Sequence, residues 1–176
     1  HVPERIAHLH LIAPAGPLET GDYLNRMAGG ALFRLARRSP MLFHALTRLQ
    51  ALLARIAPDV LVRQVFASAQ GKDAAFAADP NFRAHWATMV RACLADGAPG
   101  YRAEILGYVT PWASLLPRID IPVTLWSGSA DNWVPPDMVD ALETALPNVV
   151  AHHRFDGLSH YSTLAAAMAH VTTGPR

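Results

Sequence analysis

The chain has 176 residues, 51% of them hydrophobic, and its 15 basic and 14 acidic side chains give a formal net charge of +1. This length and composition suffice for one ordinary domain with a substantial core. The near balance of charge argues against a dedicated nucleic-acid or anionic-membrane surface, since either would need a clustered excess of lysine and arginine. Six arginines do gather between residues 34 and 63, but at the helical spacing that is typical of solvated helix faces.

The sequence also limits where the protein works. It contains no run of the roughly 18 apolar residues that would cross a bilayer, so we expect no membrane span. Cys93 is the single cysteine, and its mid-helix context predicts a buried thiol with no nucleophilic role. A lone thiol is compatible with a reducing compartment, and we expect a cytoplasmic protein. The chain begins at His1 and not at methionine, close to a predicted strand, which indicates a truncated chain. The sequence leaves the oligomeric state open.

The N-terminal two thirds read as one strand followed by helices. Alternation predicts a strand over residues 6–13, which Pro14 and Gly16 end. No strand is expected over residues 21–108. One helix is expected over residues 41–56 with an apolar stripe formed by Leu42, Leu46, Leu49, Leu53 and Ile56. Another is expected to start at Asp79 as its N-cap, and a shorter one over residues 101–108.

Strand signals return in the C-terminal third. The run IPVTLW, residues 121–126, is short and apolar on both faces, as a central parallel strand should be. A helix opened by prolines, a strand over residues 148–155, the loop GLSHYS and a last helix from about Leu164 follow. Strand, helix, strand and helix with short connections predict a right-handed crossover and a parallel sheet. The predicted fold class is therefore α/β, with a partial parallel sheet interrupted by an all-helical insertion.

Two polar residues follow the two strands of this crossover. Asp131 lies just past the first strand and His160 just past the second. Parallel strands open their carboxyl ends on one edge of the sheet, where ligands bind in open α/β folds. The two side chains are therefore expected within hydrogen-bond reach. Such a pair orients an imidazole and stabilises its protonated form while it acts as general base and acid.

These residues resemble the α/β-hydrolase family. The stretch LPRIDIPVTLWSGSADNWVPP, then LPN, then GLSHYS, is similar to the segment of that family that runs to the catalytic histidine. The resemblance implies that Asp131 is the acid of a catalytic triad and His160 its base. It also implies core strands and helices over residues 1–18 and 109–176, and a helical cap over residues 19–108.

The sequence departs from the family pattern at two points. Ser159 stands where the family usually has glycine before the histidine. No G-x-S-x-G motif occurs, and none of the serines sits in a glycine-flanked strand-to-helix turn; they are Ser39, Ser68, Ser114, Ser127, Ser129, Ser159 and Ser162. The nucleophile is therefore expected outside this chain, which alone should show no turnover.

Other candidates at this site are weaker. Asp156 is a rival acid, although its position favours a turn residue. Trp133 and Tyr161 flank the pair and are the best candidates for pocket-lining residues that bind substrate. The pairs His8 and His10, and His152 and His153, lack a third suitably spaced ligand, so no metal is expected. No cofactor is expected either.

The sequence thus favours part of an α/β-fold hydrolase that cleaves an ester or similar bond of a small apolar substrate. An epoxide or haloalkane hydrolase of the same fold, with aspartate as nucleophile, remains an alternative. So does a catalytically silent member that binds a ligand under the cap. The residue at the nucleophile position would separate the three.

Overall fold

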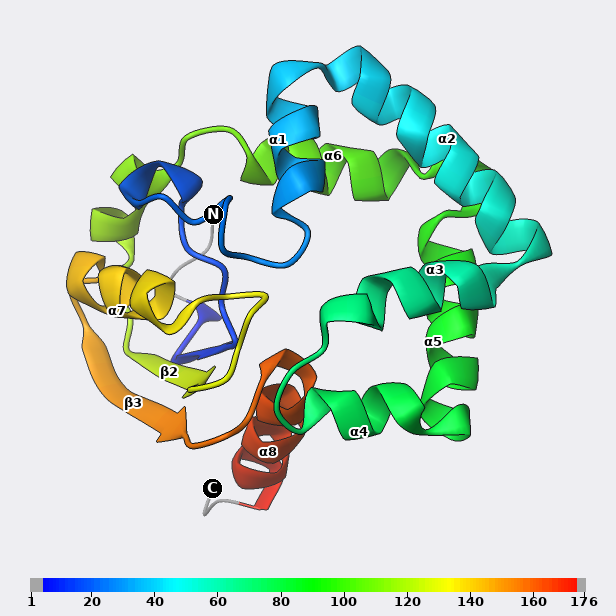
Figure 1. Cartoon of the computed structure of the whole chain (residues 1–176). Coiled ribbons are helices and arrows are strands. Elements are labelled where there is room, and N and C mark those ends of the chain that lie inside the picture. The colour runs from blue at the N-terminus through cyan, green and yellow to red at the C-terminus, as the bar shows by residue number, and fades with distance from the viewer. Residues whose placement is uncertain (1–4, 174–176) are drawn as a thin grey trace. The chain divides into compact units, whose positions relative to one another are not determined.

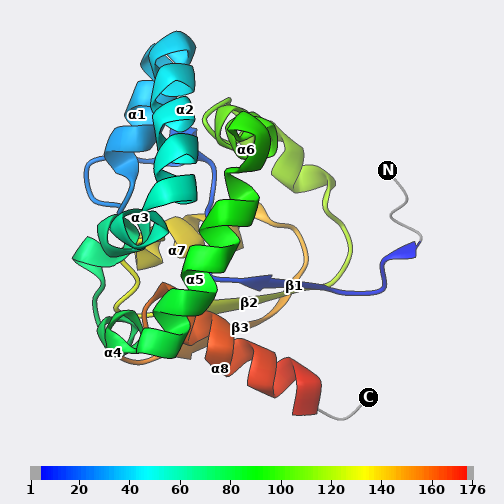
Figure 2. The same ribbon diagram turned by 90° about the vertical axis from the view of Figure 1, so that its right-hand side faces the viewer.

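The structure is a computed structural model that describes residues 5–173. The chain divides into two compact units. The sheet unit comprises residues 5–28, Gln70–Asp73 and 111–173, and the helical unit comprises Gly29–Ala69 and Ala74–Thr110. Figure 1 labels the α-helices and the strands β2 and β3, and Figure 2 also labels β1.

Three parallel strands form the sheet, in the order β1-β2-β3. Their bounds are Leu9–Ile12, Val123–Gly128 and Val149–Phe155. Every residue of the central strand β2 is buried, because the sheet is covered on both faces. The predicted α/β fold, a partial parallel sheet interrupted by a helical insertion, is confirmed. Strand β1 is shorter than the predicted residues 6–13, and directly after it Ala13 turns the chain with a φ of 45°.

Two helices cover opposite faces of this sheet. They are α7, Pro136–Ala145, and α8, His160–Thr173, and Figure 2 shows them on either side of the strands. Successive strand residues point to opposite faces. Accordingly the ring of Trp126 lies 5.8 Å from that of His170 in α8, whereas the Ser127 hydroxyl bonds to His152, which in turn bonds to Glu143 of α7. Short 3₁₀ turns at Leu18–Thr20 and Ala113–Arg118 complete the sheet unit.

Helix α8 starts earlier than predicted. The last helix was expected from about Leu164, with His160 on a loop, but His160 is the first residue of α8. Ser159 stands at the N-cap position, and the hydroxyl of Ser162 accepts from its N–H, but the Ser159 side chain caps neither of the next N–H groups. The backbone N–H groups of Tyr161 and Ser162 donate to the carboxylate of Asp73, which comes from a distant part of the chain.

Proline begins four helices of the helical unit, α2, α3, α5 and α6. Its helices are α1 Gly30–Arg38, α2 Pro40–Ile56, α3 Pro58–Val65, α4 Asp73–Ala78 (whose first residue belongs to the sheet unit), α5 Pro80–Cys93 and α6 Pro99–Tyr108, with 3₁₀ turns at Phe66–Ser68 and Ala95–Gly97. Proline suits the first turn because its missing N–H would have no partner there. Asp79 caps α5 as predicted, accepting from Asn81 and Phe82. Within residues 5–173, no helix combines the length and apolar character needed to cross a bilayer.

One burial prediction in this unit was wrong, that of Cys93, and the apolar stripe of α2 mostly faces away from the core. Helix α2 buries Phe43, Thr47, Ala51 and Ala54, while most of the predicted apolar stripe faces outward, with Leu42 58% and Ile56 70% exposed. The inner face of α2 thus consists of Phe43 and three small side chains. Cys93, expected to be buried, is exposed because α5 turns Ala87 and Val90 inward.

Candidate active site

The loop after β2 fixes the carboxylate of Asp131. The side chain is buried, with the residue 5% exposed. Its Oδ1 accepts hydrogen bonds from the backbone N–H groups of Trp133 at 2.8 Å and Val134 at 2.9 Å. These two bonds close the turn and hold the carboxylate in one orientation. The second oxygen, Oδ2, is left to meet another group.

That group is His160. Its Nδ1 lies 3.0 Å from Asp131 Oδ2, across 29 positions of sequence. A hydrogen bond to a carboxylate requires the proton on Nδ1, which leaves Nε2 as the acceptor. The Asp131 side chain is 2% exposed and that of His160 26% exposed. The structure therefore brings the two predicted residues together, with the carboxylate buried and the imidazole accessible.

The two loops that carry the pair are bonded to each other. The N–H of Ser129 donates to Phe155 O, and the N–H of Ala130 donates to Leu158 O, each at 2.9 Å. Asp156, the rival acid, accepts a hydrogen bond from the Ser129 hydroxyl at 2.9 Å. This bond ties the Asp156 carboxylate to a turn, as its sequence position indicated.

Trp133 and Tyr161 flank the imidazole. The His160 ring centroid lies 6.1 Å from that of Trp133 and 5.1 Å from that of Tyr161, in a tilted and an edge-on arrangement. Burial raises the pKa of Tyr161, and the carboxylates of Asp73 and Asp131 raise it further, so this phenol stays neutral. Among the described residues, the Trp133 indole N–H is a buried donor without a hydrogen-bond partner. Both rings are thus half-buried walls beside His160.

Several serines of the sheet unit have other partners. The Ser127 hydroxyl lies 2.8 Å from His152 Nε2. The Ser162 hydroxyl accepts from the N–H of Ser159, and the Ser159 hydroxyl is itself buried with no partner among the described residues. The hydroxyls of Ser127 and Ser162 are thus engaged within the sheet unit.

Sequence reasoning missed Asp73. This carboxylate is fully buried at the start of α8, although its own segment precedes β2 by some fifty residues. A lone aspartate at the start of a predicted helix is a common N-cap signal, and it carries no information about a partner 88 positions away. The contact could therefore not be found from local pattern.

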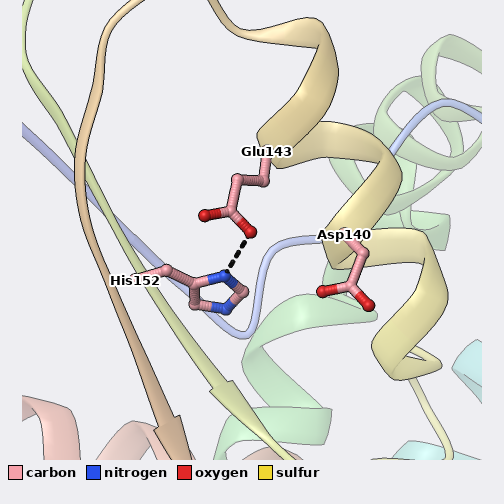
Figure 3. Close-up of side chains that lie close together, drawn as sticks. All are labelled: Asp140, Glu143 and His152. Atoms are coloured by element: carbon pink, nitrogen blue, oxygen red, sulfur yellow. Dashed lines mark hydrogen bonds and ion pairs between the residues drawn. The ribbon is translucent and has the colours of Figure 1, made fainter.

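Among the described residues, one group of side chains has the spacing of metal ligands. Asp140 and Glu143 from α7 and His152 from β3 offer ligand atoms within 4.8 Å of one another (Figure 3). Both nitrogens of His152 are engaged, by Glu143 and by Ser127. The Arg154 guanidinium bonds to Asp140 and Glu143, each at 2.8 Å. A cation would have to displace this guanidinium, so the cluster is better described as an ion-pair network.

Two histidines at the start of the sheet, His8 just before β1 and His10 within it, are also engaged. His8 Nε2 lies 2.9 Å from the Thr124 hydroxyl, and His10 Nδ1 accepts from the Trp126 indole at 3.3 Å. Desolvation lowers the pKa of His10, and the nearby His8 and His153 lower it further. This face of the sheet is therefore a packed cluster of rings.

The ion-pair network predicts a dependence of stability on pH. The hydrogen bond from His152, with Arg154 adding to it, lowers the pKa of Glu143 in the folded state. A depressed carboxyl pKa stabilises the fold above the ordinary glutamate pKa, and this stability is lost as the pH falls through the folded-state value. We expect Glu143→Gln to lower the free energy of unfolding by about 0.5–1 kcal/mol at pH 7. Below the folded-state pKa of Glu143 the substitution should leave the free energy of unfolding unchanged. Urea unfolding at pH 7 and at a pH below the folded-state pKa of Glu143 measures this, and Glu104→Gln at an exposed position is the control. An equal cost at both pH values would contradict it.

Comparison with known proteins gives structural similarity only. No family model matches the chain, and no curated protein matches it significantly. A thermophilic esterase from Thermogutta terrifontis, solved with malate bound, is similar in structure at 17% identity with a TM-score of 0.54, over 98% of this chain and 56% of that one. A protein of Mycobacterium tuberculosis H37Rv described as a candidate non-heme bromoperoxidase, BpoC, is similar at 18% identity with a TM-score of 0.56. The match covers 97% of this chain and 56% of that one. The chain thus spans little more than half the length of these proteins.

Proposed function

Because the chain folds as part of an α/β-hydrolase, we propose that it supplies the acid and base of a hydrolase that cleaves an ester or similar bond of a small apolar substrate. His160 is the base and Asp131 the acid that orients it. The observation that carries the proposal is the 3.0 Å contact between His160 Nδ1 and a buried, anchored Asp131 carboxylate. The same contact leaves His160 Nε2 as the proton acceptor.

In the proposed reaction a hydroxyl nucleophile attacks the carbonyl carbon while His160 Nε2 takes its proton. Asp131 stabilises the resulting imidazolium through Nδ1. The imidazolium then gives the proton to the leaving alcohol, and water repeats the sequence to release the acid and restore the nucleophile. We place the nucleophile outside these 176 residues, in a segment that joins this chain in the full-length enzyme.

Substrate binding is assigned to Trp133 and Tyr161. Their rings lie 6.0 Å apart and flank His160, so a bond presented to Nε2 would lie beside aromatic surface. The indole N–H of Trp133 is buried and has no partner among the described residues, so a substrate oxygen would reach it only if the indole ring turned. Of the expected cap, residues 19–108, we assign that role to the helical unit, Gly29–Ala69 and Ala74–Thr110, which interrupts the sheet between β1 and β2, while residues 19–28 and Gln70–Asp73 belong to the sheet unit. These features favour a small, largely apolar substrate with one polar group.

The test compares substrates and lengths of chain. The full-length enzyme should hydrolyse short-chain aryl esters, whereas residues 1–176 alone should not, because a base without a positioned nucleophile and oxyanion donors has no reaction to promote. Turnover of an epoxide or haloalkane in place of esters would favour the alternative hydrolase. Full-length protein that turns over none of these would indicate a ligand-binding member. Ester turnover by residues 1–176 that disappears in His160→Ala would show that the nucleophile lies in this chain.

A further inference from the structure

The first turn of α8, which carries His160, lacks a local cap. The first N–H groups of a helix need acceptors from outside the helix, and the residue before the helix usually provides one. That residue here is Ser159, whose hydroxyl is buried and has no partner among the described residues. The Ser162 hydroxyl accepts from the N–H of Ser159, which is only half of the usual reciprocal arrangement.

The missing acceptor comes from Asp73. One carboxylate oxygen accepts from the N–H of Tyr161 at 2.9 Å and the other from the N–H of Ser162 at 2.8 Å. Asp73 is fully buried, so neither bond competes with bulk water. Charged acceptors make stronger hydrogen bonds than neutral ones, and a negative charge is favoured at a helix N-terminus. The carboxylate therefore fixes the two residues that directly follow His160.

The segment that carries Asp73 is itself held against both loops of the candidate active site. Gly71 has a φ of 53°, which favours glycine. A Cβ at this position would lie 2.7 Å from Gly157 O, in the loop before His160, and 3.2 Å from Ala130 Cβ, beside Asp131. Only glycine permits this approach. Residues 70–73 thus pack on the neighbours of both members of the pair.

We propose that Asp73 is a positioning residue for His160: its carboxylate holds the first turn of α8 so that the imidazole meets Asp131. The proposal rests on the proposed function, in which that contact orients the base. It assigns Asp73 no contact with substrate. The carboxylate acts through the backbone of residues 161 and 162, and its loss would let the imidazole leave the 3.0 Å contact with Asp131.

A matched control exists in the same chain. Asp79 also caps a helix, α5, through the N–H groups of Asn81 and Phe82, and it belongs to the helical unit. Asp73→Asn and Asp79→Asn each weaken one helix cap by the same chemical change. If Asp73 only stabilised the fold, Asp73→Asn would retain the wild-type geometry at His160 wherever the variant is still folded, as Asp79→Asn should.

The first measurement needs no hydrolytic activity. In ¹⁵N-labelled residues 1–176, the ring-nitrogen shifts of His160 should report a single tautomer protonated on Nδ1. Asp73→Asn should give a mixture of tautomers, whereas Asp79→Asn should retain the single one. The second measurement uses the full-length enzyme, in which Asp73→Asn should lower kcat by up to about 10²-fold with KM unchanged, and Asp79→Asn should leave kcat unchanged.

The outcomes separate the two proposals. Unchanged His160 tautomers in Asp73→Asn, or an equal fall of kcat in Asp79→Asn, would overturn the positioning role. Absence of ester turnover in the wild-type full-length enzyme would overturn the proposed function and leave the tautomer measurement as the test of positioning. If Asp73→Asn does not fold, Asp73→Ser replaces it with a smaller acceptor. In the wild-type chain the amides of Tyr161 and Ser162 should exchange slowly, and fast exchange there would overturn the proposal without any variant.

Discussion

Asp131→Asn is expected to lower the kcat of the full-length enzyme by about 10⁴-fold, the effect of the same change in serine proteases. The substitution can keep an oxygen at Oδ1 for the N–H groups of Trp133 and Val134, so the turn survives. It places an amide NH₂ group where Oδ2 now meets His160 Nδ1, which favours the tautomer with the proton on Nε2. A nitrogen that already carries its proton cannot act as the base.

Steady-state hydrolysis of an aryl ester measures this effect, and His160→Ala should reduce turnover at least as much. Asp156→Asn is the control, because its carboxylate bonds to Ser129 and not to the imidazole. Near-normal kcat in Asp131→Asn together with a large loss in Asp156→Asn would transfer the role of the acid to Asp156. Circular dichroism of each variant separates chemistry from loss of fold.

Gly128→Ala is expected to destabilise the protein by about 3 kcal/mol, because overpacking a closed site forces the backbone to shift. A Cβ on Gly128, the last residue of β2, would overlap the carbonyl oxygen of Leu158 and the hydroxyl of Thr163. Both atoms belong to the segment that carries His160. The strand can accept the methyl group only by pushing this segment away, so ester hydrolysis should fall as well.

Gly107→Ala in α6 is the matched control. A Cβ there meets no atom within 4 Å, and alanine is the better helix former by about 0.5–1 kcal/mol. Urea unfolding of the two variants should therefore give changes of opposite sign. Stability within a few tenths of a kcal/mol of wild type for Gly128→Ala would show that the loop moves freely, and that the close packing of β2 on residue 158 does not fix His160.

The approach of Asp131 to His160 could be predicted because it follows from topology alone. Two parallel strands joined by one helix must open on the same edge, whatever their side chains. The start of α8 could not be predicted, because its cap comes from Asp73, 88 positions away from Tyr161. The periodicity of apolar residues also did not predict which face of α2 is buried. Its sequence has one face of leucines and one of small residues, and the pattern alone cannot tell that Phe43 and Ala54 face the core while Leu42 does not.

The positions of the three strands in the sequence determine the order in which we expect them to pair during folding. Contacts between β2 and β3 join residues such as Ser127 and His152, 25 positions apart, whereas those between β1 and β2 join residues such as His10 and Thr124, 114 positions apart. Closing the longer loop costs about 1.4 kcal/mol more conformational entropy. We therefore expect β1 to add last, after the helices of residues 29–110 and the β2–β3 pair have formed. Until then one edge of the buried strand β2 stays unpaired, and at high concentration that edge can pair with a second chain.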